Sequence, residues 1–397
     1  MIHWKRNVFL LAVGIGGTSA SYTMLVPFLP LYLLDLGTPN ELVAVYSGAV
    51  FSVTFLVAAI MSPIWGKMAD TKGKKVMAVR ACVALTVTYF IGGLVTSPQQ
   101  LFGMRVLQGF ANGFLPMVLA MASASAPRQQ LGYALGIVQT GQIIGSVLGP
   151  LLGGSIAELV GMRASFFVAS GFLLLVTLMV VFFVKEPVAE QAVTSAPQDK
   201  TTLWEDFCYA FHNRSVLAML ILAFIICMAN MILQPVISLY VAQLQHSMEN
   251  VAFTSGFIFS LGGIAGILST TTWGRLGQHR SYYFVLALSF CGAGLFNFLQ
   301  YFPASIILFA VLQFFFGLFF MGANPAVNAI LVTATPADFR GRVFGLSTMA
   351  NQMGFMAGPL AGSAISMAWG IQSVFLITGP VLFAIGAFLW LLRRHTA

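Results

Sequence analysis

Long apolar runs constrain this chain more than any other feature of its sequence. The stretches Leu10 to Leu34, Val43 to Trp65 and Ser215 to Ala242 contain almost no charged side chain. A helix needs about 20 such residues to cross the roughly 30 Å hydrocarbon core of a bilayer. Membrane-spanning β-strands are about ten residues long and alternate strictly, and that pattern is missing. The runs therefore predict an all-α polytopic membrane protein.

The composition agrees with a membrane environment. Hydrophobic residues make up 58% of the chain and charged residues 8%, whereas a soluble domain carries about 25% charge. The first apolar segment is too long for a cleaved signal peptide, so we expect a retained span. Twelve transmembrane helices are predicted, at roughly residues 8–34, 41–65, 76–96, 99–122, 132–157, 163–184, 214–243, 251–273, 281–301, 304–332, 343–367 and 371–392.

The charge distribution predicts an orientation. The net charge is +8, and every Lys and Arg except Arg105 and Arg163 falls on one side of the twelve-span arrangement. Positive residues collect on the cytoplasmic side, so we expect both termini and the middle loop in the cytoplasm. This assigns the basic residues to topology in a cell (plasma or inner) membrane, with the lipid bilayer as partner and without nucleic acid. The four cysteines form no CxxC pair and the five histidines lie in loops or tails, so no disulfide framework, metal or cofactor is predicted.

The chain is an internal duplication. Pro27 and Pro235 lie 208 residues apart, as do Trp65 and Trp273, and further pairs recur at an offset of 208 or 209. Each half holds six spans, so the halves are parallel repeats, and a substrate site is expected between them near the midplane. Three segments are predicted: an N-terminal half at 1–184, a cytoplasmic linker at 185–213, and a C-terminal half at 214–397. The linker contains a short interfacial helix or, as the alternative, is an ordinary amphipathic connection.

The stretch "GKMADTKGKK" follows the second span and suits a conformational latch. Glycines permit tight turns, and a carboxylate is favoured at a helix N-terminus. The spacing resembles the loop signature of the major facilitator superfamily, and the resemblance implies that the acid meets the start of the eleventh span. The second half has Gln278 in place of the acid, so we expect one working latch. The motif residues are Gly66, Asp70, Gly73, Lys74 and Lys75.

The stretch "GQIIGSVLGPLLGG" puts glycines on one helical face at every fourth residue. Small residues let membrane helices approach closely, and an internal proline bends a helix. The stretch resembles the antiporter motif of the twelve-span drug/proton antiporter branch, and we expect its partner helix to come from the other half. "NQMGFMAGPLAG" in the eleventh span repeats the pattern, and we expect it to pack against the opposite half as well. The motif residues are Gly141, Gly145, Gly149, Pro150, Gly153 and Gly154.

Polar residues within spans mark a candidate substrate cavity. The superfamily resemblance places spans 1, 4, 7 and 10 around it, and abundant aromatic and Met side chains make it apolar and adaptable. For each polar residue, a bridge between helices is the alternative to substrate contact. The candidates are Tyr22, Gln108, Asn112, Gln139, Gln142, Asn230, Gln234, Asn324 and Asn328.

Arg105 is the one charge clearly inside a span, in "RVLQGFANG", which resembles a second superfamily motif. An intramembrane charge indicates function by default, although a snorkelling anchor is an alternative. Asp35 ends the first span on the same side, and the two residues are candidates for proton coupling. The alternative for Asp35 is a solvated residue at the helix end. None of the eleven acidic residues lies in the middle of a span.

These features predict a secondary transporter rather than an enzyme. The resemblance implies export of amphipathic or hydrophobic small molecules in exchange for protons by alternating access, as in multidrug efflux and antibiotic resistance, and we expect a monomer. The missing mid-span acid keeps open a facilitator or importer of a specific metabolite on the same fold. A membrane-embedded enzyme or a sensor is disfavoured because the spans hold no His/Asp/Glu cluster.

Overall fold

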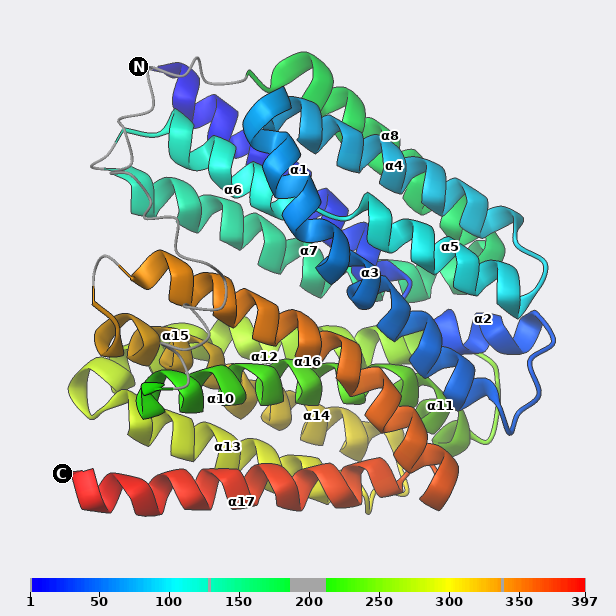
Figure 1. Ribbon diagram of the computed structural model, residues 1–397. Helices are drawn as coiled ribbons and strands as arrows, with labels where there is room; N and C mark the ends of the chain where they lie inside the picture. Colours follow the sequence, from blue (N-terminus) through cyan, green and yellow to red (C-terminus); the bar gives the residue numbers. More distant parts are fainter. Residues whose placement is uncertain (1, 128–129, 186–211, 337–338, 397) are drawn as a thin grey trace. The chain divides into compact units, whose positions relative to one another are not determined.

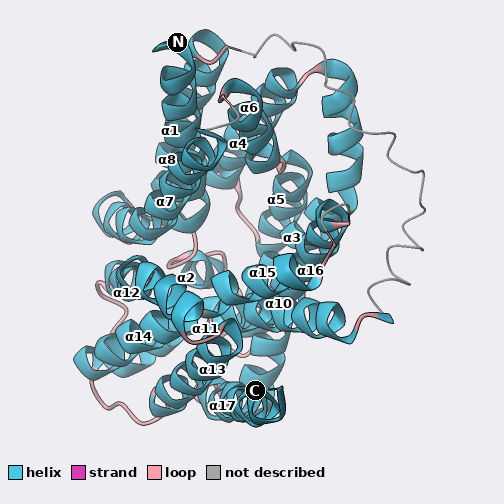
Figure 2. Ribbon diagram, turned by 90° about the vertical axis from the view of Figure 1, so that its left-hand side faces the viewer, coloured by secondary structure: helices cyan, strands magenta, loops and turns pink. Residues whose placement is uncertain are grey.

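The protein is all-helical in the residues that the computed structural model describes, which are 2–127, 130–185, 212–336 and 339–396. Figure 2 shows helices and loops throughout this part of the chain. The residues form two compact units, Met1–Ala196 with Asn250–Ser260 and Pro197–Glu249 with Leu261–Ala397. The predicted interfacial helix of the linker lies outside the described residues.

In its described residues the first unit contains eight helices and the beginning of a ninth. Within it α1 lies beside α7 and α8, α4 lies beside α8, and α3 lies beside α5 (Figure 1). The helices are α1 (Ile2–Met24), α2 (Leu29–Asp35), α3 (Val43–Lys72), α4 (Lys74–Leu94), α5 (Pro98–Ala111), α6 (Phe114–Ser125), α7 (Leu131–Val160), α8 (Met162–Phe183) and the start of α12 (Val251–His279).

The second unit repeats much of this arrangement. Helix α10 packs on α16, and α13 packs on α17 along the lower edge of Figure 1. Its helices are α10 (Arg214–Ile232), α11 (Gln234–Gln245), the remainder of α12, α13 (Tyr282–Leu299), α14 (Ile306–Phe320), α15 (Ala323–Ala334), α16 (Arg340–Trp369) and α17 (Ser373–Thr396).

The helices account for the predicted spans. Ten helical segments among the described residues are long and apolar enough to cross a membrane. The pair α1 and α2, bent by 46° at their junction, supplies an eleventh. The remaining predicted span, 343–367, coincides with the 30-residue α16, which is less apolar because it carries side chains such as Asn351 and Gln352. Three of the ten spans are helix pairs, α5 with α6, α10 with α11, and α14 with α15.

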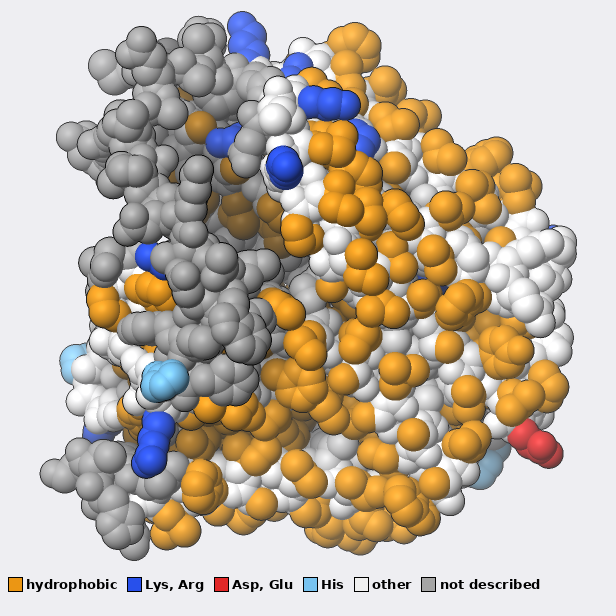
Figure 3. Space-filling view, in the orientation of Figure 1, with side chains coloured by type: hydrophobic (Ala, Val, Ile, Leu, Met, Phe, Trp, Pro, Cys, Tyr) orange, Lys and Arg blue, Asp and Glu red, His pale blue; other side chains and the backbone are white. Residues whose placement is uncertain are grey.

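The surfaces of the units suit a bilayer. Hydrophobic side chains dominate the face drawn in Figure 3 over helices of both units. In the first unit, Phe182 is 72% exposed and Phe90 is 52% exposed. Exposed apolar surface on this scale is unfavourable in water and is expected where lipid covers a helix.

The duplication is visible in individual hydrogen bonds. Trp65 Nε1 donates to the carbonyl of Phe110 at 3.1 Å, and Trp273 Nε1 donates to the carbonyl of Leu318 at 2.7 Å. Both donors and both acceptors are 208 residues apart. In each unit the tryptophan binds the last turn of the first helix in a broken pair. The repeat therefore extends from the sequence to the way each half satisfies its backbone.

Candidate functional site

The glycine face of α7 packs against α1 of the same unit. An added Cβ at Gly145 would lie 2.8 Å from the carbonyl carbon of Gly16 and 2.9 Å from its Cα, so the two backbones are in direct contact. The expectation that this face meets a helix of the other half is therefore wrong for most of the motif. Small residues on α1 permit the contact as well as those on α7. The pairs in contact are Gly141 with Ala12, Gly145 with Gly16, Gly149 with Ala20, and Gly153 with Met24.

A second edge of α7 faces the first turns of α12, which lie in the predicted C-terminal half although they fall in the first compact unit. For this edge of the motif the expected contact with the other half is therefore observed. A Cβ at Gly154 would lie 2.9 Å from the Cα of Phe253, and a Cβ at Gly256 would lie 2.9 Å from the carbonyl carbon of Pro150. Ser260 Oγ donates a hydrogen bond of 2.6 Å to the carbonyl of Val147. The antiporter motif therefore has one face for α1 and one edge for the start of α12.

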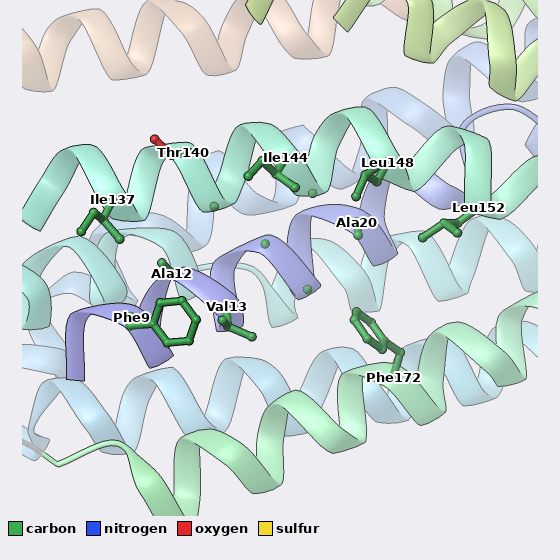
Figure 4. A pocket seen from close by; sticks show the side chains of 14 residues that line it. Phe9, Ala12, Val13, Ala20, Ile137, Thr140, Ile144, Leu148, Leu152 and Phe172 are labelled. Atoms are coloured by element: carbon green, nitrogen blue, oxygen red, sulfur yellow. The ribbon is translucent and has the colours of Figure 1, made fainter. Parts of the chain in front are cut away.

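An apolar groove of about 430 Å³ runs along the α1–α7 contact (Figure 4). Its walls come from α1 and α7, with Phe172 of α8 at one side, and Thr140 supplies the one side-chain oxygen among the labelled residues. Gly141 and Gly145 form part of its floor. The groove is a consequence of the bare glycine face, because no side chain fills the seam beside it.

The eleventh-span motif is used in the same way in the second unit. A Cβ at Gly354 would lie 2.8 Å from the Cβ of Cys227, and one at Gly358 would lie 2.8 Å from the Cβ of Met231, both on α10. The partner is again a helix of the same unit, so the expected packing against the opposite half is not observed for these glycines.

Arg105 of α5 is the most deeply buried charged residue among those described in the first unit. Its side chain is 1% exposed, and Nη1 donates to Gln108 Oε1 at 2.8 Å. Gln108 lies one turn further along α5, and its Nε2 donates to the hydroxyl of Tyr89 on α4 at 2.9 Å. The guanidinium carbon lies 5.5 Å from the ring centroid of Phe51 on α3. Helices α3, α4 and α5 thus build an enclosed cationic site.

Much of this site lacks a hydrogen-bond acceptor. Arg105 Nε and Nη2 have no partner among the described residues, and neither has the buried hydroxyl of Tyr22 on α1. Tyr22 and Tyr89 both lie within electrostatic reach of the guanidinium. The Tyr22 ring meets Phe55 edge to face at 6.1 Å. Unpaired buried donors are rare in proteins and call for a functional explanation.

Asp35 does not join this site. It is the last residue of α2 and is exposed, and no hydrogen bond or ion pair among the described residues connects it to Arg105. The proposed pairing of Asp35 with Arg105 is therefore not observed, and the solvated helix end describes Asp35 better. The reason is geometric, because Arg105 turns inward to Gln108 and the two tyrosines.

Sequence reasoning missed Arg80, which it assigned to topology. Arg80 of α4 donates to the carbonyls of Phe110 at 3.2 Å and Asn112 at 3.1 Å, and its guanidinium carbon lies 3.8 Å from the ring centroid of Trp65. These carbonyls are freed where α5 ends and the chain passes through Gly113, with φ +124°, into α6. The signal in the sequence was the Asn-Gly pair inside a predicted span.

The latch residues are only partly described. Helix α3 continues to Lys72 and α4 begins at Lys74, so the predicted loop is reduced to Gly73, whose φ of 94° suits glycine. Lys75 Nζ donates to the carbonyl of Val181 on α8 at 2.8 Å. Gly66 has open space around it, and the Asp70 side chain lies outside the described part of the chain.

The cavity candidates occupy different environments. Gln108 is 2% exposed and is held by Arg105 and Tyr89, so its first role is to position the buried site. Asn324 and Asn328 lie one turn apart on α15 and are both exposed. As substrate contacts all nine candidates stay predictions. The half-buried ones are Tyr22, Gln142, Asn230 and Gln234, and the exposed ones are Asn112, Gln139, Asn324 and Asn328.

A membrane fold of duplicated helix bundles with glycine-packed fifth and eleventh spans defines a class of transporters, the major facilitators. The model of the Major Facilitator Superfamily matches residues 11–299 and 254–397, and the chain belongs to this superfamily.

Similar proteins were found over the full length of the chain. It is 34% identical over 399 residues to the "Multi-drug resistance efflux pump PmrA homolog" of Lactococcus lactis subsp. lactis (strain IL1403), covering 98% of this chain and 95% of that protein. It is 34% identical over 404 residues to the "Multidrug resistance protein MdtG" of Rahnella sp. (strain Y9602), covering 99% and 95%.

Solved structures share the fold at low sequence identity. The nucleoside transporter NupG superposes with a TM-score of 0.79 at 16% identity, covering 98% of each chain. A bacterial homolog of the human lysosomal transporter Spinster, inward-facing and occupied, has a TM-score of 0.79 at 14% identity, covering 100% of this chain and 98% of that chain.

Proposed function

We propose that this transporter exports amphipathic small molecules from the cell in exchange for protons. The observation that carries the proposal is the backbone contact of α7 with α1. It uses the glycines of the stretch that resembles the drug/proton antiporter motif, and it leaves no room for larger side chains. The names of the relatives that are 34% identical over the whole chain support the same class of substrate. The protein would act in the cell membrane as a monomer, with both termini in the cytoplasm and no cofactor.

The experiment is transport into proteoliposomes together with drug susceptibility of an efflux-deficient host. A panel of amphipathic compounds is tested with and without an imposed pH gradient. We expect resistance in cells and gradient-dependent movement in vesicles, both lost in Gly145→Leu because leucine forces α7 away from α1. A transport rate that is the same with and without the pH gradient would rule out proton exchange.

A facilitator or importer of a specific metabolite is the second candidate. It is favoured by the placement of the acids, since none of the eleven lies mid-span, where proton-coupled transporters place carboxylates. Equilibration of one solute without a gradient, together with unchanged drug susceptibility, would support this candidate over export.

A further inference from the structure

The buried site around Arg105 presents donors almost exclusively. Arg105 Nε and Nη2 and the Tyr22 hydroxyl have no acceptor among the described residues. The Tyr89 oxygen already accepts from Gln108 Nε2, which leaves its own proton to donate. A guanidinium has five donors and no acceptor, and here only Nη1 is used. The site therefore lacks a hydrogen-bond acceptor, and an anionic acceptor makes the strongest hydrogen bonds to a guanidinium.

None of the carboxylates that the structure describes fills that place. Among the described spans, acidic residues occur only near the ends, with Asp35 in the last turn of α2 and Glu158 in the last turn of α7. Neither makes a hydrogen bond or ion pair to Arg105 among the described residues. Burying a charge without a partner is costly, so a partner from outside the protein is the simplest completion.

The packing of the helices does not require a charged residue at position 105. In the second half the equivalent position, 208 residues on, is Gln313 of α14. Its Oε1 accepts from Gln300 Nε2 at 3.0 Å, so a neutral amide fits the same place. The register is secure because Ser97 and Ser305, also 208 residues apart, cap the two helices in the same way. The fold therefore accommodates a neutral side chain where the first half keeps a charge.

We propose that Arg105, with Tyr22 and Tyr89, binds the carboxylate of a transported amphiphile. A planar guanidinium matches a carboxylate through two parallel hydrogen bonds, and the phenol hydroxyls supply further donors. The aromatic rings of Phe51 and Phe55 beside the site suit the apolar part of such a molecule. The preferred substrates are thus amphipathic carboxylic acids rather than organic cations.

This inference rests on the proposed transport function in one respect. Arg105 is 1% exposed in this structure, so the ligand reaches it when the helices around it separate, as alternating access requires. Binding itself needs no gradient and no vesicle. A failure of proton-driven export and a failure of anion binding are therefore distinguishable.

The experiment measures binding to the full-length purified protein with two probes of one skeleton. 1-Naphthaleneacetate carries a carboxylate at pH 7, and 1-naphthaleneacetamide is its neutral counterpart. We expect the wild type to bind the acid at least about tenfold more tightly than the amide, because charge-assisted hydrogen bonds are strong in a buried site. Equal affinities, or no binding of either probe, would overturn the proposal.

Three variants locate the preference. Arg105→Gln copies the side chain of the second half, so it is expected to fold, and it should bind acid and amide equally. Tyr22→Phe keeps the ring and should reduce the preference several-fold, which preserves the test if Arg105→Gln aggregates on size-exclusion chromatography. Arg163→Gln is the matched control, since Arg163 is exposed and its Nη2 donates to the carbonyl of Val95 at 3.2 Å, outside the Arg105 site, and it should leave the preference unchanged. A preference that survives in Arg105→Gln contradicts the assignment.

A competition arm separates the two possible sources of the anion. Chloride is titrated against bound 1-naphthaleneacetate, with sodium sulfate at equal ionic strength as the comparison. Displacement by millimolar chloride would overturn the carboxylate assignment in favour of an inorganic ion. Retention of the acid in both salts supports the carboxylate of the substrate.

Discussion

Substitution of Gly145 by alanine tests whether the α1–α7 contact controls both stability and transport. The new Cβ would lie 2.8 Å from the carbonyl carbon of Gly16 and 2.9 Å from its Cα. The atom nearest to the new Cβ is the Gly16 carbonyl oxygen. Non-bonded carbon atoms are most stable at about 3.5–4.0 Å, so the helices must separate by at least roughly 0.7 Å at this point. Backbone atoms cannot rotate away as the end of a flexible side chain does. The strain is therefore shared along the seam from Gly141 to Gly153.

The size of the effect follows from comparison with Gly136 on the same helix. A Cβ at Gly136 meets nothing within 4 Å. Alanine is favoured over glycine in a helix by about 1 kcal/mol, and this gain applies to both Gly136→Ala and Gly145→Ala. The difference between the two variants is the overpacking alone, about 1–3 kcal/mol.

The assay has two parts, thermal unfolding of the purified variants in detergent and efflux from cells at matched expression. We expect Gly145→Ala to unfold at a lower temperature than Gly136→Ala and to lose most efflux, while Gly136→Ala keeps the efflux of the wild type. Labelling of single cysteines from each side of the membrane would show slower exchange between inward-open and outward-open states. Equal unfolding temperatures and equal efflux in the two variants would refute the reasoning.

Three further predictions use single substitutions. Asp70→Asn should abolish most transport without affecting membrane insertion, whereas Gln278→Ala should have little effect; equal losses at equal expression would contradict a single latch. Arg80→Gln removes two hydrogen bonds to carbonyls and the stacking on Trp65, so it should lower the free energy of unfolding by about 1.5–3 kcal/mol; an unchanged thermal midpoint would show that the break in the span needs no cap. Asp35→Asn should retain pH-driven transport within about twofold, because Asp35 is exposed and lies apart from Arg105; abolished transport would return Asp35 to the mechanism.

The spans and the duplication could be predicted from the sequence, and the partner of the glycine face could not. Apolar runs determine which segments cross a membrane because the bilayer requires the same length and apolar character of every span. A glycine at every fourth residue predicts a close helix contact, but it does not specify the partner helix. Ala12, Gly16 and Ala20 on α1 have the same spacing, and their match with α7 is a property of the packed bundle.

The functions of individual charges were harder to predict than the fold. Arg80 has the sequence signature of a topology signal, because a basic residue near a span end looks the same whether it faces headgroups or caps a broken helix. Its role depends on the two carbonyls freed between α5 and α6, which only the structure brings to it. The depth of Arg105 was predicted from its place in the span, but the direction of its side chain was not, since Gln108 and Tyr89 determine it.

The two halves share their packing and differ in their charges. The glycine contacts of α7 with α1 and of α16 with α10 correspond, and so do the tryptophan bonds to the broken spans. At an offset of 208 residues, several charged positions of the first half are neutral in the second, among them Asp70 with Gln278, Arg80 with Leu288, and Arg105 with Gln313. Since the second half forms the same fold without these charges, folding does not require them. These charged residues of the first half are therefore the candidates for latching, hinge control and ligand recognition. The neutral residue at the equivalent position of the second half is the substitution with which to test each charged residue.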